Sequence, residues 1–568
     1  MDIHAAPVAA GRPPALDGPT LCHAFQLTAA EHPEAVALRN PGDAVALTWR
    51  EYAERVEAIA AGLAAHGVER GDTVGLMVLN RPEFHLLDTA TLHLGATPFS
   101  VYNTSTAEQA GYQFADAGAR VVVTERHFLC TVLAARTLAP SVEHVVLVDG
   151  AEDGVVSLDQ LEHSGASSFR FAETWQAVAP GDLATVIYTS GTTGPPKGVE
   201  LTHANALAQC AASAERFPLA PGGRAMSYLP SAHVVDRWTC HWWASMTHGL
   251  TVTTVGAMGT AILMLPSVRP TLWSGVPRIW EKLRRMLVAE GVDPAAMSEE
   301  ERAGVRERLG LDAAEHLGGG AAPMPIDVLT YLDALGLDVA EAWGMSEIGG
   351  AGTANPHGAA RMGTCGTPLP GVELALAGDD ELLVRGPMLM RGYHNDPEGT
   401  EVAIDDEGWL QTGDLAHIDD DGYVSIIDRK KDLIITAGGK NMSPGNIEAE
   451  VERASPLISH AVAVGDRRPY IVALVMLDAE AAAAFAAEHG LADASPAALA
   501  ADHDVRTAVS EAIEMANTRL SRVEQVKRFA IVPDEWRAGG PELTPTLKLK
   551  RRAVAARYAP EIDALYTS

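Results

Sequence analysis

The segment from Tyr188 to His203, YTSGTTGPPKGVELTH, concentrates residue types that bind phosphate. Glycines let the backbone curl so that successive N–H groups point at one anion, hydroxyls add donors, and a lysine adds a compact positive charge. These types occur together in one short run: Thr189, Ser190, Gly191, Thr192, Thr193, Gly194 and Lys197. The segment therefore predicts a loop that holds the phosphates of a nucleotide.

This loop differs from the Walker motif, in which Gly-Lys-Ser/Thr opens a helix. Pro195 and Pro196 stand before Lys197, and a proline has no backbone N–H, so the anion-binding turn must precede them. The apolar, β-branched residues just before the loop predict a buried strand. A strand that ends in such a loop favours a ligand at the carboxyl edge of an open α/β sheet. An ordinary flexible turn is the alternative.

The elements that must position this loop alternate between helical and strand-like patterns. A helix capped by Thr48 precedes strands expected at 72–79, 119–125 and 144–149 and a helix at 82–96. Such alternation predicts mostly parallel, doubly wound sheets. Short strands and turns in 363–428 predict a small antiparallel or barrel-like unit. A basic cluster at 428–432 and an Ala-rich helical stretch at 478–516 follow, which suggests a domain boundary near Lys431.

Length and composition narrow the function classes. A chain of 568 residues exceeds one core, so at least two domains are expected. The net charge of −31 disfavours non-specific binding to nucleic acid or anionic lipid. The five cysteines lack paired spacing, which favours a reducing compartment and argues against a metal cluster. We expect neither a secretory signal nor a transmembrane segment, and hence a cytoplasmic protein.

Several further segments, in a fixed order, resemble the adenylate-forming superfamily, which includes acyl-CoA synthetases, firefly luciferase and peptide-synthetase adenylation domains. After the phosphate loop come LGGGAAP (317–323), EAWGMSE (341–347), LLVRGPMLMRGY (382–393), GWLQTGDLA (408–416), DRKKDLIITAGGKNMSPGNIE (428–448) and LTPTLKLKR (543–551). The exact residues of several segments, for example VRPTLWSGVPRIWEKL (268–283), are most similar to those of long-chain fatty acyl-CoA synthetases.

The resemblance implies a reaction in two steps. A carboxylate attacks the α-phosphate of ATP to give an acyl adenylate and pyrophosphate, and the thiol of coenzyme A then displaces AMP. The implied substrate is a medium- to long-chain fatty acid, with Mg²⁺ as cofactor. A fatty acyl-AMP ligase that loads a carrier protein, and a ligase for an aryl or amino acid, are the alternatives. A phosphoryl-transferring NTPase and a non-catalytic acyl-binding module are further alternatives.

The resemblance also implies roles for residues of the N-terminal part. The phosphate loop would hold the β- and γ-phosphates, and Glu347 with Thr189 would bind Mg²⁺. Asp414 would accept hydrogen bonds from the ribose hydroxyls, and Arg429 would add a ribose or phosphate contact. The adenine side would consist of Gly319, Gly320, Ala321, Trp343, Gly344, Met345 and Ser346. Trp343 replaces the usual tyrosine, so that stacking on adenine is retained while the phenol hydroxyl is lost.

Further residues match the positions that serve the two steps. Lys548 matches the lysine that reaches the α-phosphate and the substrate carboxylate, with Lys550 as the competing candidate. His233 matches a position near the substrate carboxylate. Lys431 matches the hinge about which the small domain turns, bringing a coenzyme A loop of Gly438, Gly439 and Lys440 to the thiol. Trp242 or Trp243 could gate an acyl tunnel, with a place in the core as the alternative.

The implied fold is α/β. A large N-terminal domain, residues 1–430, would contain two doubly wound α/β subdomains and a small β-barrel-like subdomain at 363–428. A smaller, mobile α+β C-terminal domain would span 431–568. Oligomeric state, monomer or homodimer, is left open, as is peripheral contact with a membrane.

Overall fold

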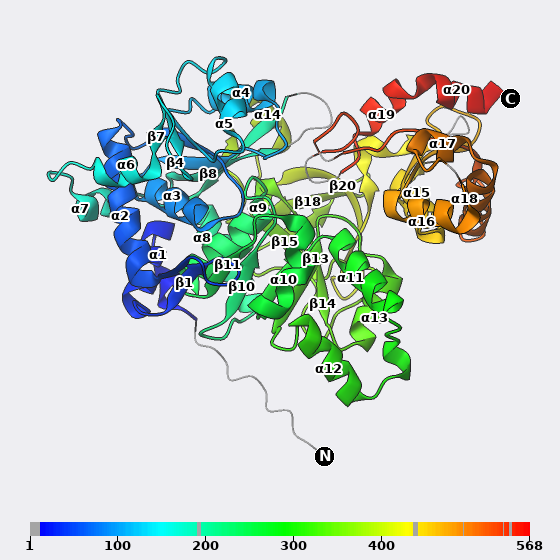
Figure 1. The fold of residues 1–568 in the computed structure, drawn as a ribbon, viewed down its shortest axis with the longest axis horizontal. Helices are drawn as coiled ribbons and strands as arrows, with labels where there is room; N and C mark the ends of the chain where they lie inside the picture. The colour runs from blue at the N-terminus through cyan, green and yellow to red at the C-terminus, as the bar shows by residue number, and fades with distance from the viewer. Residues whose placement is uncertain are drawn as a thin grey trace.

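The computed structural model describes residues 12–189, 195–435, 441–491, 493–537, 539–544 and 548–567. The fold is mixed α/β, with a large N-terminal domain and a smaller C-terminal domain that forms a separate lobe, orange to red in Figure 1.

A five-stranded parallel sheet, in the order β4-β3-β5-β6-β7, forms the first subdomain. Strand β3, which lies between β4 and β5, is buried along its whole length, as its apolar run predicts. Thr48 and Glu51 form a capping box at the start of α2, which confirms the expected helix. The strands are β3 (Thr73–Met77), β4 (Thr97–Ser100), β5 (Val121–Thr124), β6 (His144–Leu147) and β7 (Val156–Ser157). The helices around them are α2 (Trp49–Ala65), α3 (Pro82–His93), α4 (Ala107–Asp116), α5 (Leu129–Arg136), α6 (Leu158–His163) and α7 (Phe171–Gln176).

A nine-stranded sheet in the order β16-β15-β14-β13-β12-β10-β11-β1-β2 forms the second subdomain. Six central strands run parallel, while β2, β15 and β16 are antiparallel at the edges. Helices α10–α13 lie on one side of it (Figure 1) and share a core with it, and α1, α8 and the π-helix η2 belong to a second core. The strands are β1 (Val36–Arg39), β2 (Ala46–Thr48), β10 (Arg224–Ser227), β11 (Thr251–Thr254), β12 (Leu272–Gly275), β13 (His316–Gly320), β14 (Val339–Met345), β15 (Gly350–Ala354) and β16 (Thr367–Pro368). The helices are η1 (Pro14–Asp17), α1 (Leu21–Glu31), α8 (His203–Arg216), α9 (Val234–Asp236), η2 (Arg237–Thr247), η3 (Met258–Thr260), α10 (Ala261–Val268), α11 (Pro277–Ala289), η4 (Pro294–Ala296), α12 (Glu299–Leu309), α13 (Ile326–Ala334) and η5 (Ser346–Ile348).

The strand before the predicted phosphate loop forms as expected, but in a different setting. Strand β8 (Leu183–Thr189) pairs antiparallel with β9 (Lys197–Thr202), and β19 (Gly392–Tyr393) adds to β9. The loop therefore joins the two strands of a hairpin, whereas the sequence favoured the carboxyl edge of an open α/β sheet. The correction has a physical reason: β9 begins at Lys197, directly after the two prolines, and pairs back onto β8 before any helix starts.

The region 363–428 contains an antiparallel four-stranded sheet in the order β17-β18-β20-β21, as its turns predicted. Its elements are β17 (Glu373–Leu376), β18 (Glu381–Arg385), α14 (Pro397–Ala403), β20 (Leu410–Ile418) and β21 (Val424–Arg429).

The C-terminal domain is built on a three-stranded sheet, β24-β25-β26, with its own cores. The expected Ala-rich helices form within 478–516 and continue to Asn517. The elements are η6 (Lys430–Asp432), β22 (Ile434–Ile435), β23 (Asn441–Met442), α15 (Pro444–Ala454), β24 (Ile458–Val464), β25 (Ile471–Leu477), α16 (Ala479–His489), α17 (Pro496–Ala501), α18 (His503–Asn517), β26 (Val526–Ile531), α19 (Arg551–Arg557) and α20 (Ala559–Thr567).

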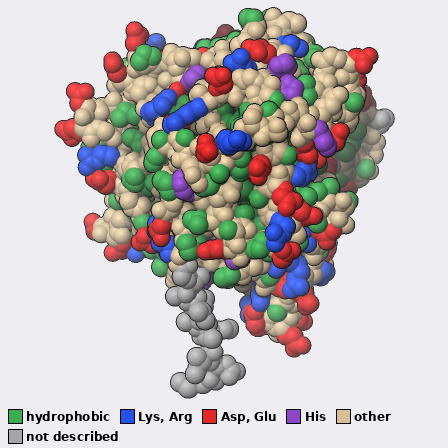
Figure 2. Space-filling view, turned by 90° about the vertical axis from the view of Figure 1, so that its left-hand side faces the viewer, with side chains coloured by type: hydrophobic (Ala, Val, Ile, Leu, Met, Phe, Trp, Pro, Cys, Tyr) green, Lys and Arg blue, Asp and Glu red, His purple; other side chains and the backbone are tan. Residues whose placement is uncertain are grey.

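Acidic and basic side chains are interspersed over the face shown in Figure 2 rather than separated into fields of one sign. Among the described helices, none has both the length and the apolar character needed to cross a bilayer.

Candidate functional site

The two ends of the predicted phosphate loop lie opposite each other. Thr189 and Lys197 are paired across the β8–β9 hairpin. The ammonium of Lys197 lies 2.8 Å from Asp396 Oδ2 and 4.5 Å from the centre of the Tyr393 ring. The residues between the ends, Ser190, Gly191, Thr192, Thr193 and Gly194, lie outside the described residues, so their contacts stay a prediction.

Glu347 lies in the turn η5 directly after β14, and its side chain is buried. The hydroxyl of Tyr393 donates to Glu347 Oε1 at 3.0 Å. Burial raises the pKa of Glu347, and the charges of Arg429 and Lys548 act in the opposite direction.

Sequence reasoning did not single out Tyr393, although it closes the quoted segment LLVRGPMLMRGY. It also missed Asp396, the partner of Lys197. Strand β19 pairs with β9, which brings Tyr393 beside the loop lysine. The only local signal is the position of the aromatic residue after Gly392, because the pairing joins segments almost 200 residues apart.

Carboxylate and hydroxyl oxygens are hard ligands of the kind that Mg²⁺ prefers, and Glu347 and Thr189 supply both. Within the described parts of the chain, no group of three or more His, Cys, Asp and Glu side chains is arranged to hold a metal ion. An ion bound at Glu347 would therefore need phosphate or water oxygens to complete its shell, which fits an ion that arrives with a nucleotide.

Asp414 is held from two sides. It stands opposite Arg429 in the β20–β21 pair, and Arg429 Nε lies 2.6 Å from its Oδ1. The indole N–H of Trp343, from β14, donates to its Oδ2 at 2.8 Å. Both Asp414 and Trp343 are buried. The site thus contains a carboxylate of fixed orientation, which is suited to accept hydrogen bonds from hydroxyls.

The expected adenine-side residues come from the ends of two adjacent parallel strands. In β13 and β14, Gly320 is paired with Ala342. Ala321, just past β13, has φ of 70°, a left-handed conformation that is uncommon for a residue with a side chain. A Cβ on Gly344 would lie 1.9 Å from the carbonyl oxygen of Gly350, so that only glycine fits there. Gly319, Met345 and Ser346 belong to the same strand ends.

Lys548 reaches this site from the C-terminal domain. Desolvation lowers its pKa, the nearby charge of Arg429 lowers it further, and the carboxylates of Asp414 and Glu347 raise it. The residue is nevertheless exposed to solvent. Lys550 instead donates to the carbonyl of Gly540 at 2.9 Å.

His233 faces Lys548 from the N-terminal domain. It caps α9, and its Nδ1 accepts the backbone N–H of Val235 at 3.3 Å. Burial, followed by the positive charge of Lys548, lowers the pKa of His233 to about 4. The ring is thus neutral near pH 7. Because Nδ1 is an acceptor, we assign the proton to Nε2.

The two domains touch through α11. Arg278 donates to the carbonyl of Ser459 at 3.3 Å and contacts the ring of His460. Arg285 lies 4.0 Å from Asp478 in an ion pair. These contacts are present in the same domain arrangement in which Lys548 lies near Asp414 and Glu347.

The expected hinge and coenzyme A loop are only partly visible. Lys431 lies exposed in the turn η6, directly after β21. Gly438, Gly439 and Lys440 lie outside the described residues.

The tryptophans of the π-helix differ in burial. Trp242 and Trp243 are buried in the core, 0% and 2% exposed. Trp238, not singled out from the sequence, is only half-buried and stacks on Trp243. Its ring lies 2.7 Å from the position that a Cβ on Gly350 would take, three residues after Glu347. Of the three, Trp238 is the one beside the site.

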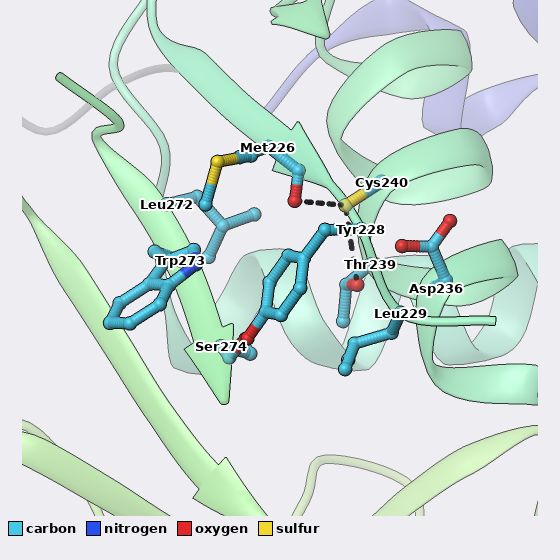
Figure 3. Close-up of a pocket in the computed structure, with 9 residues that line it drawn as sticks. All are labelled: Met226, Tyr228, Leu229, Asp236, Thr239, Cys240, Leu272, Trp273 and Ser274. Carbon is cyan, nitrogen blue, oxygen red and sulfur yellow. Dashed lines mark hydrogen bonds between the residues drawn. The ribbon is translucent and has the colours of Figure 1, made fainter. Parts of the chain in front are cut away.

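A narrow cavity of about 10 Å³ lies between the π-helix and strands β10 and β12 (Figure 3). Asp236 of α9 and Thr239 and Cys240 of the π-helix face Tyr228, which follows β10, and residues of the two strands across it. Since this volume holds about one water molecule, an acyl chain could enter here only after side chains move.

Two family models match this chain. That of the AMP-binding enzyme covers residues 25–394, and that of the AMP-binding enzyme C-terminal domain covers residues 431–568. Among solved structures, the A domain of carboxylic acid reductase from Segniliparus rugosus, in complex with AMP and a co-purified carboxylic acid, superimposes with a TM-score of 0.80. At 20% identity, covering 98% of this chain and 97% of that one, it shows a shared fold.

Curated relatives are closer in sequence. The long-chain-fatty-acid–CoA ligase FadD15 of Mycobacterium tuberculosis is 34% identical over 558 residues, covering 92% of each chain. Another protein of that organism, fadD11, is 44% identical over 453 residues, covering 73% of this chain and 79% of its own. The long-chain-fatty-acid–CoA ligase ACSBG2 of Xenopus laevis is 28% identical, covering 96% of this chain and 84% of its own.

Proposed function

Because this chain belongs to the AMP-binding enzyme family, we propose that it is an ATP-dependent fatty acid–CoA ligase. It forms an acyl adenylate and pyrophosphate, and then acyl-CoA and AMP. The names of FadD15 and ACSBG2 support a long-chain acid, and we propose a medium- to long-chain preference. The observation that carries the proposal is the meeting of Lys548, from the C-terminal domain, with Glu347, Asp414 and His233.

In the first step the substrate carboxylate attacks the α-phosphate of ATP, and negative charge builds at that phosphorus. Lys548 would neutralise this charge; its position near Asp414 and Glu347, which are assigned to the nucleotide and its metal, supports this role. His233, neutral with its proton on Nε2, donates to the carboxylate and orients it. Its low pKa keeps this form dominant near pH 7.

The phosphate loop, from Thr189 to Lys197, would hold and release the pyrophosphate, with Lys197 leaving Asp396 to pair with it. Magnesium, when bound, supplies positive charge to the phosphate oxygens, and Glu347 and Thr189 are its proposed ligands.

The second step uses a rotation of the C-terminal domain. We divide the chain into residues 1–430 and 431–568, with the hinge at Lys431. Rotation removes Lys548 from the site and brings Gly438, Gly439 and Lys440 to coenzyme A, since a pair of glycines permits close approach of the thin pantetheine arm.

The acyl chain would lie beside Gly350, in the region of the π-helix. Trp238 is the candidate for the gate that its position supports best, because it lies beside Gly350. Trp242 and Trp243 are buried in the core behind it. We further propose a cytoplasmic location for this ligase, supported by five free cysteines.

The test is AMP release that depends on coenzyme A, measured over carboxylic acids from acetate to long-chain and aromatic acids. Activity that peaks with medium- or long-chain acids supports the proposal. Acyl adenylate that accumulates and transfers only to a carrier protein would instead identify an acyl-AMP ligase. ATP–pyrophosphate exchange restricted to amino or aryl acids would exclude a fatty acid substrate.

A further inference from the structure

Trp343 makes a contact that joins two sheets. It belongs to β14 of the nine-stranded sheet, and its indole N–H donates to Asp414 of β20, in the four-stranded sheet, at 2.8 Å. Trp343 is 7% exposed and Asp414 is 4% exposed. In so buried a place a hydrogen bond to a charged group is strong and of fixed direction.

The acceptor capacity of Asp414 is divided in a definite way. A carboxylate offers about two lone pairs on each oxygen. Trp343 uses one on Oδ2, and Arg429 lies 2.6 Å from Oδ1 in an ion pair. Counting the contacts of the described residues, one acceptor position on each oxygen is then left for a ligand. Two neighbouring hydroxyls, which are two donors held a fixed distance apart, match these two positions.

The protein makes room for the indole at this point. A Cβ on Gly352, in β15, would lie 2.8 Å from Cζ3 of Trp343 and 2.9 Å from Cδ1 of Ile348. A side chain at Gly352 would therefore press on the ring and shift its N–H relative to Asp414. The position of the N–H is therefore determined by the packing of the ring against β15 as well as by its acceptor, Asp414.

We propose that Trp343 is a positioning residue for ribose: its N–H fixes the carboxylate of Asp414 so that the two remaining acceptor positions match a vicinal diol. This inference rests on the proposed function, which assigns Asp414 to the ribose of ATP. It adds that nucleotide selectivity for ribose over deoxyribose depends on an indole N–H that does not itself touch the sugar.

The test compares kcat/KM for ATP, 2′-deoxy-ATP and 3′-deoxy-ATP in the wild-type protein and in Trp343→Phe. The substitution removes the N–H and keeps an aromatic ring. We expect kcat/KM for ATP to fall about tenfold, through KM, as for loss of a hydrogen bond to a charged group. For at least one deoxy nucleotide, kcat/KM should fall less than about twofold in the variant. That nucleotide already lacks the hydroxyl that would bind the Asp414 oxygen freed by the substitution, so it has little to lose.

Gly352→Ala tests the same point while retaining the N–H, and it should weaken the discrimination in the same direction. Trp536→Phe is the matched control. Its indole N–H donates to Tyr558 at 3.0 Å inside the C-terminal domain, so the variant loses a buried hydrogen bond without changing nucleotide selectivity.

An equal fall in kcat/KM for all three nucleotides in Trp343→Phe would reduce its role to stability and overturn the inference. Asp414→Asn separates this from failure of the proposed function. If Asp414→Asn abolishes ribose selectivity and Trp343→Phe preserves it, the inference alone fails. If Asp414→Asn itself retains wild-type selectivity, the assignment of Asp414 to ribose fails, and the inference fails with it.

Discussion

Tyr393 connects the loop lysine to the buried carboxylate of the site. Its hydroxyl donates to Glu347 Oε1 at 3.0 Å, while the ammonium of Lys197 lies 4.5 Å from the centre of its ring. One side chain thus touches the group proposed to hold phosphate and the group proposed to hold Mg²⁺.

Removing this hydroxyl should impair use of the metal. In Tyr393→Phe, Glu347 loses a donor that lowers its pKa, so the pKa rises further and the carboxylate is ionised only at higher pH. We expect the Mg²⁺ concentration for half-maximal acyl-adenylate formation to rise about tenfold, as for loss of a group that orients a metal ligand. The acidic limb of the pH–rate profile should therefore shift to higher pH. Tyr423→Phe, which loses a bond to the carbonyl of Ala359, is the control, and an unchanged Mg²⁺ titration in Tyr393→Phe would contradict the role.

Lys548→Ala should separate the half-reactions. Because the ammonium is proposed to neutralise charge at the α-phosphate, acyl-adenylate formation should fall about a hundredfold or more. Thioester formation from supplied acyl adenylate should be spared. Lys550→Ala, whose parent side chain binds the carbonyl of Gly540, should leave both steps nearly intact. Equal loss of both half-reactions in Lys548→Ala would refute its assignment to the first step.

Lys431→Pro tests the hinge. A proline fixes φ near −65°, which restricts the rotation proposed for the second step. Thioester formation should therefore slow more than adenylation. Lys431→Ala removes the same side chain and leaves the backbone free, so it should behave like the wild type. A selective loss of adenylation in Lys431→Pro would count against a hinge at this residue.

The docking of the C-terminal domain should depend on Arg278. Arg278→Ala removes the contacts to Ser459 and His460, which accompany the presentation of Lys548. Adenylation should slow about threefold to tenfold, as for loss of one or two hydrogen bonds, while transfer to coenzyme A should not. Arg284→Ala is the matched control, because Arg284 pairs with Asp327 inside the N-terminal domain. Equal effects in the two variants would rule out a specific docking role.

Buried histidines should make the protein acid-sensitive. Burial lowers the pKa of His93 to about 4 and that of His203 to about 3. Below pH 6.5 the unfolded chain binds protons that the folded chain does not. As the pH falls below 6.5, each such histidine therefore lowers the free energy of unfolding by about 1.4 kcal/mol for every pH unit, until the pH reaches the pKa of that histidine in the folded protein. Urea midpoints measured from pH 7.5 to 4.5 should fall, and less steeply in His203→Asn. Parallel slopes for the two proteins would disprove this contribution.

The sequence by itself determined the local elements. Strand β3, the capped helix α2 and the antiparallel sheet at 363–428 follow from hydrophobic periodicity and turn residues, which act over short distances. The ordered motifs also determined the family, because each motif combines residue types that bind nucleotide, and the family models cover both parts of the chain.

Only the tertiary structure decided which groups meet. The bond from Trp343 to Asp414 joins two sheets, the contact of Tyr393 with Glu347 arises from pairing of distant strands, and Lys548 arrives on another domain. Burial likewise showed that Trp242 and Trp243 lie in the core while Trp238 borders the site. These features depend on long-range packing and desolvation, which residue spacing does not encode, because the pKa and partner of a side chain are set by neighbours distant in the chain.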